Sequence, residues 1–319
     1  MASRSSSAIW LSFVAANLFG GELQRFEAVE PHMGSMVHIV LYAPDEDAAK
    51  RAFQSAFARV AELDGILSDY KADSELNRLC AARSAIVSID LFRVLDASLR
   101  LASESQGAFD ITAGPMIRLW REARKTGVLP DAAALRATQA HSGWRKLTLD
   151  RVTRRATLAE ADMQLDVGGI AKGYVADEAV QTLKQHGIVS ALVAASGDIA
   201  VSDPPPGKSG WDLTIELLGG TRDIKLRNAA VSTAGDTEQF VEIGGVRYSH
   251  IINPATGQAL TTPIAVSVIA PTGLEADGLD TTISVLGVER GLELLKPHPN
   301  AKALIVTGNG ARETPGFGR

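Results

Sequence analysis

Six short apolar segments follow one another in the second half of the chain, and this succession restricts the fold more than any other feature. Each has the length and β-branched content of a strand, and turn residues separate several of them. Strands joined by short turns pair antiparallel, since a parallel pair needs a long crossover. We therefore predict an α+β fold with mixed, largely antiparallel sheets. The segments are IVSALVAAS (188–196), WDLTIELL (211–218), RDIKL (222–226), QFVEI (239–243), RYSHII (247–252) and PIAVSVIA (263–270).

Helical patterns precede and interrupt these strands. MVHIVLYA (36–43) alternates as a strand should, and Asp45 or Asp47 is then placed to cap a long amphipathic helix. Three short strands are expected between 143 and 165, the last of them MQLDV, and Gly187 marks a helix end. The helices are expected at about 48–67, 89–105, 170–187 and 275–295.

The composition is that of a globular protein that folds around a sizeable core. The chain has 319 residues, 45% of them hydrophobic and 22% charged, and no long linker divides it. Its net charge is −5 and it has no run of Lys and Arg, so nucleic acid is not an expected partner. The single cysteine, Cys80, excludes an internal disulfide and a cysteine-built metal site.

The N-terminus carries an apolar run from Ala8 to about Phe19, preceded by a lone Arg4. Small residues near Ala15 could serve a signal peptidase, so residues 1–30 are interpreted as a signal peptide or an apolar N-terminal segment, and 31–319 as one domain. The run is too short to span a bilayer. Export is therefore an expectation, with an apolar N-terminal segment of no targeting role as the alternative.

The stretch LDVGGIAKGYVAD (165–177) places Asp166, two glycines and Lys172 where an extended segment enters a helix. Bare backbone at a helix N-terminus attracts anions, phosphate above all, and Lys172 could add a cation. The spacing matches neither the dinucleotide fingerprint nor the P-loop. The alternative is structural: Gly168 and Gly169 let strand and helix pack closely, and Asp166 is a cap.

A second group lies in LEADGLDTTISVLG (274–287). On one helix Asp277 and Thr281 are four residues apart and share a face, which offers a carboxylate and a hydroxyl to one point. Such oxygen ligands suit Mg²⁺, which usually shares its shell with water and substrate phosphate. The alternative is helix-start chemistry, because Glu275, Asp277 and Asp280 all favour a first turn.

The third group is RYSHIINPATG (247–257), in which His250 stands between strand-like residues and a turn signal. A neutral imidazole at a strand end beside a cleft can take a proton from a hydroxyl. A histidine with no chemical role remains the alternative. No metal-ligand spacing links the other five histidines.

Taken in order, the motifs of this chain resemble those of the ApbE-type FAD:protein FMN transferase family from Met33 onward. The order and spacing carry the resemblance, since no single motif would suffice. The motifs are MGSMVHIVLY (33–42), LSDYKADSELNRL (67–79), GAFDITAGPMIRLW (107–120), LDVGGIAKGYVAD (165–177), ASGDI (195–199), SHIINPATG (249–257) and EADGLDTT (275–282).

The resemblance implies an ApbE-like (T-fold-like) single domain with FAD in a cleft between subdomains. It also implies Mg²⁺-dependent transfer of the FMN half to a Thr or Ser hydroxyl of a partner protein as a phosphoester, with release of AMP. Residues of the FAD site would be Met33, Tyr70, Ala108, Phe109, Asp110, Asp166, Lys172 and Ile252.

The resemblance further implies that Asp277, Thr281 and the main-chain carbonyl of Gly169 hold the metal, and that His250 activates the acceptor hydroxyl. Asp280 could reach the metal through water. The acceptor would be another polypeptide, a redox or membrane electron-transfer protein, because this chain contains no acceptor-like segment. An exported enzyme, periplasmic or associated with the inner membrane, would fit such a partner.

The chain departs from the family motifs at two places, and two other functions remain as alternatives. Ser196 and the two alanines before it stand where such proteins often carry glycine and a side-chain amide, which puts the contacts of that loop in doubt. Asn253 stands where aspartate is common, a tolerable change if the side chain forms an Asx-turn. The alternatives are an FAD pyrophosphatase, with water as nucleophile, and a non-catalytic FAD-binding protein.

Overall fold

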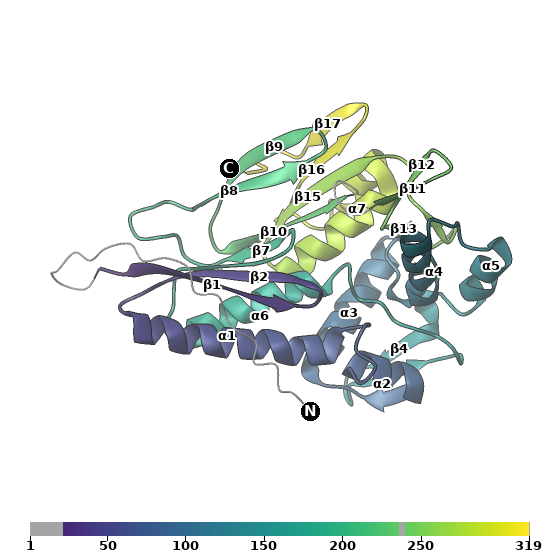
Figure 1. Ribbon diagram of the computed structural model, residues 1–319, viewed down its shortest axis with the longest axis horizontal. Helices are drawn as coiled ribbons and strands as arrows, with labels where there is room; N and C mark the ends of the chain where they lie inside the picture. The colour runs from purple at the N-terminus through teal and green to yellow at the C-terminus, as the bar shows by residue number, and fades with distance from the viewer. Residues whose placement is uncertain (1–21, 236–239, 319) are drawn as a thin grey trace.

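An eight-stranded sheet, in which every neighbouring pair is antiparallel, forms the centre of the molecule (Figure 1). The computed structural model describes residues 22–235 and 240–318. This sheet confirms the α+β prediction. Its strands, in spatial order, are β1 (Gln24–His32), β2 (Ser35–Ala43), β6 (Ala191–Ala195), β7 (Asp198–Val201), β10 (Ala229–Gly235), β15 (Ile264–Ala270), β16 (Lys302–Thr307) and β17 (Gly310–Glu313).

Three long helices cover one face of this sheet, and a hairpin covers part of the other. Side chains that alternate along a strand reach opposite faces, so Ile39 and Leu41 join the helix-side core while Val40 joins the hairpin side. Trp211 and Phe317 fill the smaller core under the hairpin. The helices are α1 (Glu46–Leu67), α6 (Ala171–Gln185) and α7 (Gly273–Leu294), and the hairpin is β8 (Trp211–Leu217) with β9 (Gly220–Leu226).

The chain between α1 and α6 builds a second lobe beside the sheet (Figure 1). Trp120 and Met116 of α4 pack against Ile252 of β13 in a separate apolar cluster, which ties this lobe to a later hairpin. The elements are α2 (Glu75–Ala82), β3 (Ser84–Ile86), α3 (Ile89–Glu104), η1 (Ile111–Ala113), α4 (Gly114–Thr126), α5 (Ala132–Ala140), η2 (Trp144–Lys146), β4 (Leu147–Asp150) and β5 (Arg155–Leu158), followed later by the pairs β11 (Phe240–Ile243) with β12 (Val246–Ser249) and β13 (Ile252–Asn253) with β14 (Gln258–Ala259).

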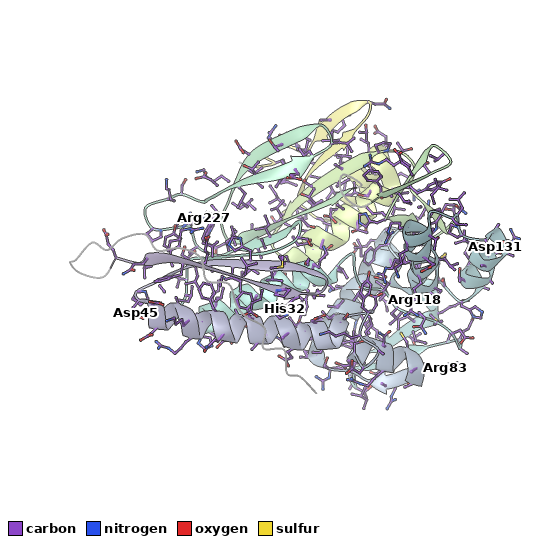
Figure 2. The ribbon with its side chains drawn as sticks, viewed as in Figure 1. His32, Asp45, Arg83, Arg118, Asp131 and Arg227 are labelled. Atoms are coloured by element: carbon purple, nitrogen blue, oxygen red, sulfur yellow. The ribbon has the colours of Figure 1, made fainter. Side chains whose placement is uncertain are left out.

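Local signals in the sequence predicted several element ends correctly. Asp45, at the outer end of α1 in Figure 2, accepts a hydrogen bond of 2.7 Å from the Ala48 N–H. Gly187 follows α6 with a φ of 79°. The prediction of a strand at MQLDV was wrong: this segment is irregular, and the Asp166 N–H bonds the carbonyl of Ile111 instead of a neighbouring strand.

The helices α2, α4 and α5 lie outside the four helices predicted from the sequence. Ser74 begins α2 by accepting a hydrogen bond of 3.1 Å from the Asn77 N–H. Residues 24–30, grouped in the sequence analysis with the N-terminal segment, belong to β1, whereas the apolar run before them lies outside the described residues. No helix within 22–235 or 240–318 is long and apolar enough to cross a membrane.

The helices α6 and α7 meet at two glycines that allow their backbones to touch. A Cβ on Gly173 would overlap the Gly273 carbonyl, and a Cβ on Gly273 would overlap the Gly173 carbonyl. The Asp277 carboxylate of α7 accepts a 3.0 Å bond from the Gly173 N–H, at the start of α6. In return, Asp177 of α6 accepts bonds of 2.7 Å and 3.0 Å from the N–H groups of Gly273 and Leu274, at the start of α7. Each helix therefore caps the other.

The reciprocal cap predicts a pH-dependent stability. Burial raises the pKa of Asp177 from 3.8 to about 6, against the hydrogen bonds from Gly273 and Leu274 that lower it. Because the folded pKa exceeds the unfolded one, the contribution of Asp177 is complete below about pH 4 and is lost as the pH rises through 6. Relative to Asp177→Asn, the wild type should lose up to about 3 kcal/mol of unfolding free energy between pH 4 and 7. Urea denaturation of both proteins across this range measures the difference, and a difference that does not change with pH would contradict the prediction.

Candidate functional site

Four charged side chains meet beside the start of α6. The ammonium of Lys172 is paired with the buried carboxylate of Asp198, at the first position of β7. The hydroxyl of Ser232 on β10 lies between Asp198, at 2.5 Å, and Asp280 of α7, at 2.6 Å, and its one proton serves one of the two carboxyl groups. Asp277 completes the group, since its charge also acts on Lys172. One lysine thus faces three buried carboxylates.

This imbalance shifts the protonation of the carboxylates. Burial raises the pKa of Asp277 to about 7, with Asp198 adding to the rise and Lys172 opposing it. Burial also raises the pKa of Asp280 well above its ordinary value. For Lys172, burial works in the opposite direction, but the three carboxylates outweigh it and raise the pKa. A further cation would therefore be stabilised strongly at this point.

Two of the residues predicted to hold the metal, Gly169 and Thr281, are in contact at the same place. A Cβ on Gly169 would lie 3.0 Å from both Oγ1 and Cγ2 of Thr281, so the turn and the face of α7 are in close contact. The Oδ1 atom of Asp280 is buried and has no hydrogen-bond partner. Within the described chain, no three His, Cys, Asp or Glu side chains form a metal cage. A set with one or two carboxylates fits Mg²⁺, which completes its shell with water and phosphate.

Asp166 belongs to a second group, centred on Arg121 of α4. Nη2 of Arg121 donates to Asp166 at 2.6 Å, and Nη1 donates to Asp69. The same guanidinium lies over the ring of Tyr70, 4.4 Å from its centroid, while Tyr70 is 76% exposed. Burial, with Asp69 adding to it, raises the pKa of Asp166. The group presents an exposed aromatic ring whose inner face is held by a fixed cation.

The segment Ala108, Phe109 and Asp110 is fixed by local bonds. Asp110 accepts hydrogen bonds from the N–H and hydroxyl of Thr112, at 2.8 Å and 2.6 Å, and from the N–H of Trp144, at 2.9 Å. Phe109 is buried in the helix-side core. Burial, partly offset by these bonds, raises the pKa of Asp110. In this structure Asp110 therefore caps η1 and anchors the start of η2.

His250 lies at a bulge between two short strands. Its neighbours both bond Leu260: the Ser249 N–H donates to the Leu260 carbonyl at 2.8 Å, and the Leu260 N–H donates to the Ile251 carbonyl at 2.9 Å. The Ser249 hydroxyl also accepts the Ile251 N–H, at 3.1 Å. Leu260 thus holds the backbone on both sides of His250, and such a bulge can redirect a side chain.

The predicted residues thus form two groups and several separate positions. Gly169, Lys172, Asp277 and Thr281 come together at the crossing of α6 and α7, and Asp166 and Tyr70 come together through Arg121. Ile252 is buried in the α4 cluster, and Met33 occupies the β1–β2 turn with a φ of 50°. Asn253 forms the expected Asx-turn, accepting the Ala255 N–H at 2.9 Å.

Three charged residues of this region were missed as site residues: Asp69, Arg121 and Asp198. Asp69 and Asp198 lie inside motifs already recognised, LSDYKADSELNRL and ASGDI, and Arg121 follows another motif directly. An arginine at the end of the largely apolar run PMIRLW was the available signal, because a buried arginine needs partners.

Comparison with known proteins shows which family the chain belongs to. The model of the ApbE family matches residues 33–305. The chain belongs to the ApbE family. A Treponema pallidum protein named FAD:protein FMN transferase is 32% identical, and the match covers 89% of this chain and 85% of that protein. A protein of the same name from Haemophilus influenzae is 31% identical, with 87% and 86% covered.

Solved structures of the ApbE family share the fold. The apo form of the Pseudomonas stutzeri flavinyl transferase ApbE superposes with a TM-score of 0.81 at 30% identity, covering 95% of this chain and 98% of that one. The flavin transferase ApbE from Vibrio cholerae gives 0.80 at 28% identity, covering 92% and 97%. The predicted family membership and fold class are confirmed.

The Arg121 group predicts a large loss of stability when the arginine is removed. Arg121→Met leaves Asp69 and Asp166 without their shared cation, which should lower the unfolding free energy by about 3 kcal/mol at neutral pH. The loss should shrink at lower pH, where protonated Asp166 needs no cation. Arg136→Met, at an exposed position on the neighbouring helix α5, is the matched control and should change stability little. Equal losses in the two variants in guanidinium denaturation would contradict this role of Arg121.

Proposed function

We propose that this protein is an FAD:protein FMN transferase that uses Mg²⁺ to move the FMN half of FAD onto a Thr or Ser hydroxyl of a partner protein, with release of AMP. The observation that carries the proposal is the contact of Gly169 with Thr281 beside three buried carboxylates that share Lys172. Such an excess of negative charge in a buried site favours a divalent cation. The names of the relatives support the flavin chemistry.

The residues at the crossing of α6 and α7 fit the metal. Asp277, Thr281 and the Gly169 carbonyl would hold Mg²⁺. Asp280, whose buried Oδ1 has no hydrogen-bond partner, would reach the ion through a water molecule. When bound, the ion would supply electrostatic stabilisation of the negative charge that develops on the leaving phosphate. Lys172 adds positive charge at the same end of α6, where the positive end of the helix dipole also favours an anion.

The second group would orient the substrate. Tyr70 offers an exposed ring for stacking with a planar heterocycle, and Arg121 keeps that ring in place by covering its other face. Asp166 is fixed by Arg121 and by the Gly168 N–H, which donates to it at 2.8 Å. A rigid support of this kind lowers the entropy cost of bringing the reacting groups together.

His250 would accept the proton of the acceptor hydroxyl. The hydroxyl oxygen forms a bond to the phosphorus nearer the flavin, the bond from that phosphorus to the bridging oxygen breaks, and AMP departs with the electron pair. The proton moves to the imidazole, so atoms and charges balance. The bulge at Ser249–Ile251 holds the backbone on both sides of His250, which suits a base that must meet its partner at a fixed distance.

The transfer reaction is tested directly by intact-protein mass spectrometry. A flavin-acceptor domain with one target threonine is incubated with the enzyme, FAD and Mg²⁺, and AMP is followed in the same sample. His250→Ala should bind FAD with unchanged affinity. The rate at which the acceptor gains the mass of one FMN should fall at least 100-fold, which is the usual contribution of a general base. AMP without labelled acceptor would indicate the pyrophosphatase alternative. FAD binding without either product would indicate a binding protein.

The metal assignment predicts a second result. Asp277→Ala should abolish transfer and remove the Mg²⁺-dependent part of FAD binding. In the wild type, FAD at 100 times its dissociation constant with Mg²⁺ should add about 2.7 kcal/mol to stability, and EDTA should remove most of this gain. Thermal unfolding with and without Mg²⁺ measures it. Full activity of Asp277→Ala would overturn the assignment.

The proposal extends to the setting in which the enzyme acts. The apolar run Ala8–Phe19 supports export, so the acceptor would be a redox or electron-transfer protein outside the cytoplasm or in the membrane. Fractionation of cells that express the full chain tests this part, and recovery of an uncleaved protein from the cytoplasm alone would contradict it.

A further inference from the structure

The turn between β4 and β5, residues 151–154, presents an aliphatic side chain to water. In Figure 1, β4 lies on the lower side of the second lobe, away from the β8–β9 hairpin at the top. Val152 in this turn is 93% exposed, the highest value of any large hydrophobic side chain in the described part of the chain. Asp150 fixes the turn by accepting the N–H groups of Val152, at 2.8 Å, and Thr153, at 3.2 Å. The exposed valine is therefore held by an ordered backbone.

Two exposed isoleucines lie beside this turn. Ile86 of β3 is paired with Arg155 of β5 and is 58% exposed. The next residue, Val87, donates its N–H to the Arg154 carbonyl at 3.0 Å. Ile89, at the start of α3, is 43% exposed. A single exposed aliphatic residue needs no explanation, but three on segments joined by backbone hydrogen bonds form a patch.

Arginines surround this patch. Arg151, Arg154 and Arg155 are all exposed. Arg151 donates to Asp96 of α3 through Nε and Nη2, at 2.9 Å and 2.8 Å, and Arg100 lies 3.5 Å from the same carboxylate. The whole chain has a net charge of −5, so this concentration of arginines is local. We call this surface the arginine tip; it consists of Ile86, Ile89, Val152, Arg151, Arg154 and Arg155.

We propose that the arginine tip docks on an anionic membrane surface, with its aliphatic side chains among the lipid headgroups and its guanidinium groups on the lipid phosphates. A guanidinium matches the geometry of a phosphate and binds it through paired hydrogen bonds. Aliphatic side chains that project from a surface can enter the boundary between headgroups and acyl chains. A protein partner fits less well, because each side of a stable complex buries about 800 Å², more than three aliphatic side chains supply.

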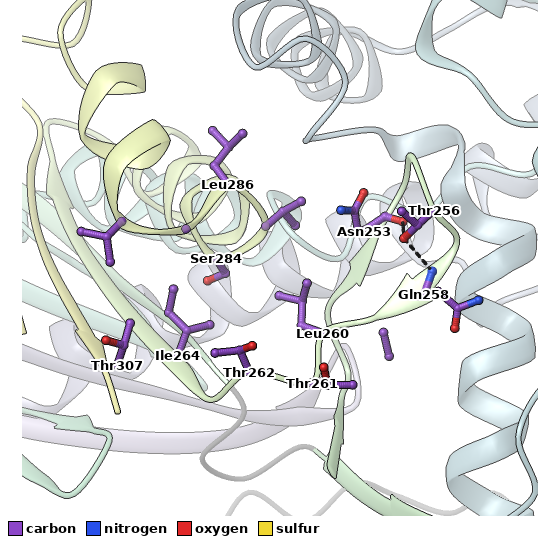
Figure 3. Close-up of a pocket in the computed structure, with 14 residues that line it drawn as sticks. Asn253, Thr256, Gln258, Leu260, Thr261, Thr262, Ile264, Ser284, Leu286 and Thr307 are labelled. Atoms are coloured by element: carbon purple, nitrogen blue, oxygen red, sulfur yellow. Dashed lines mark hydrogen bonds between the residues drawn. The ribbon is translucent and has the colours of Figure 1, made fainter. Parts of the chain in front are cut away.

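The arginine tip is separate from the candidate site. None of its residues belongs to the two charged groups, and none lines the cavity of about 390 Å³ that Figure 3 shows between the β13–β14 hairpin and α7. Docking therefore leaves both groups free, and it requires neither FAD nor a metal. Variants of the arginine tip should keep wild-type FAD affinity and wild-type transfer to a soluble acceptor domain.

The test uses a probe on the tip itself, because the apolar run Ala8–Phe19 could also hold the full chain on a vesicle. The single cysteine, Cys80, is buried, so Val152→Cys provides one accessible thiol for an environment-sensitive fluorophore. Vesicles of phosphatidylcholine with phosphatidylglycerol should shift its emission to the blue, and vesicles of phosphatidylcholine alone should not. The matched control is the same label on Val128→Cys, in the loop after α4, where the native side chain is 66% exposed; its emission should not change.

The role of the arginines is tested on the same labelled protein. Arg154→Gln with Arg155→Gln should remove most of the blue shift, since each arginine near an anionic surface contributes about 5-fold to binding. Added salt should weaken the shift as well. Arg136→Gln with Lys184→Gln removes the same charge at exposed positions of α5 and α6, and should leave the shift unchanged.

The outcomes separate this inference from the proposed function. No shift at position 152, an equal shift without phosphatidylglycerol, or an equal shift at position 128 would overturn membrane docking. A loss of transfer to the soluble acceptor domain in the double arginine variant, without vesicles, would assign the tip to a protein partner and would also overturn it. If the wild type transfers no FMN, the proposed function fails, while the vesicle result stands by itself.

Discussion

The contact between Gly173 and Gly273 is the constraint on which the rest of the site depends. Because neither residue has a side chain, the starts of α6 and α7 approach until their backbones touch. This approach brings Asp277 to the Gly173 N–H and Asp177 to the start of α7, where it adds to the cap that Thr272 provides by accepting the Glu275 N–H. It also brings Thr281 against Gly169. A side chain at either glycine would push the two helices apart, and would thereby separate the reciprocal caps and move Thr281 away from Gly169.

The same approach concentrates negative charge where little water reaches it. Asp277 and Asp280 of α7 are buried near Asp198 of β7, and Lys172 is the cation that they share. Buried charge of one sign is costly unless it is neutralised by protons or cations. The raised pKa values of Asp277 and Asp280 show the first response, protonation, and a divalent cation would be the second. The same buried carboxylates that lower folding stability would therefore raise the affinity for a cation, and they lie at one helix crossing.

The sequence predicted the parts of the fold and site that depend on local spacing. Asp277 and Thr281 share a helix face because they are four residues apart, and Asp45 and Gly187 delimit helices through chemistry within three residues. Partners brought together by the tertiary fold were not predicted. Arg121 joins Asp69 and Asp166 across 52 and 45 residues, and no local pattern encodes that. The strand predicted at MQLDV failed for the same reason, since its backbone bonds Ile111 rather than a sheet neighbour.

The family motifs supplied what spacing could not, since they pointed to His250 and to Gly169 before any contact was known. They did not indicate how His250 is held. That answer came from the backbone, in which Leu260 bonds the residues on both sides of the histidine.

The number of residues in the bulge at His250 decides on which face of the strand the neighbouring side chains lie. In a regular strand, side chains alternate between faces, so the number of residues before a position decides which face it uses. Here Ser249 and Ile251, two residues apart, bond the same partner, Leu260, so the segment around His250 holds two residues more than the strand it faces. An even number of extra residues leaves the alternation of faces unchanged on both sides. Deletion of one residue at this point would make that number odd, and the side chains of β12 would then lie on the opposite face relative to β13.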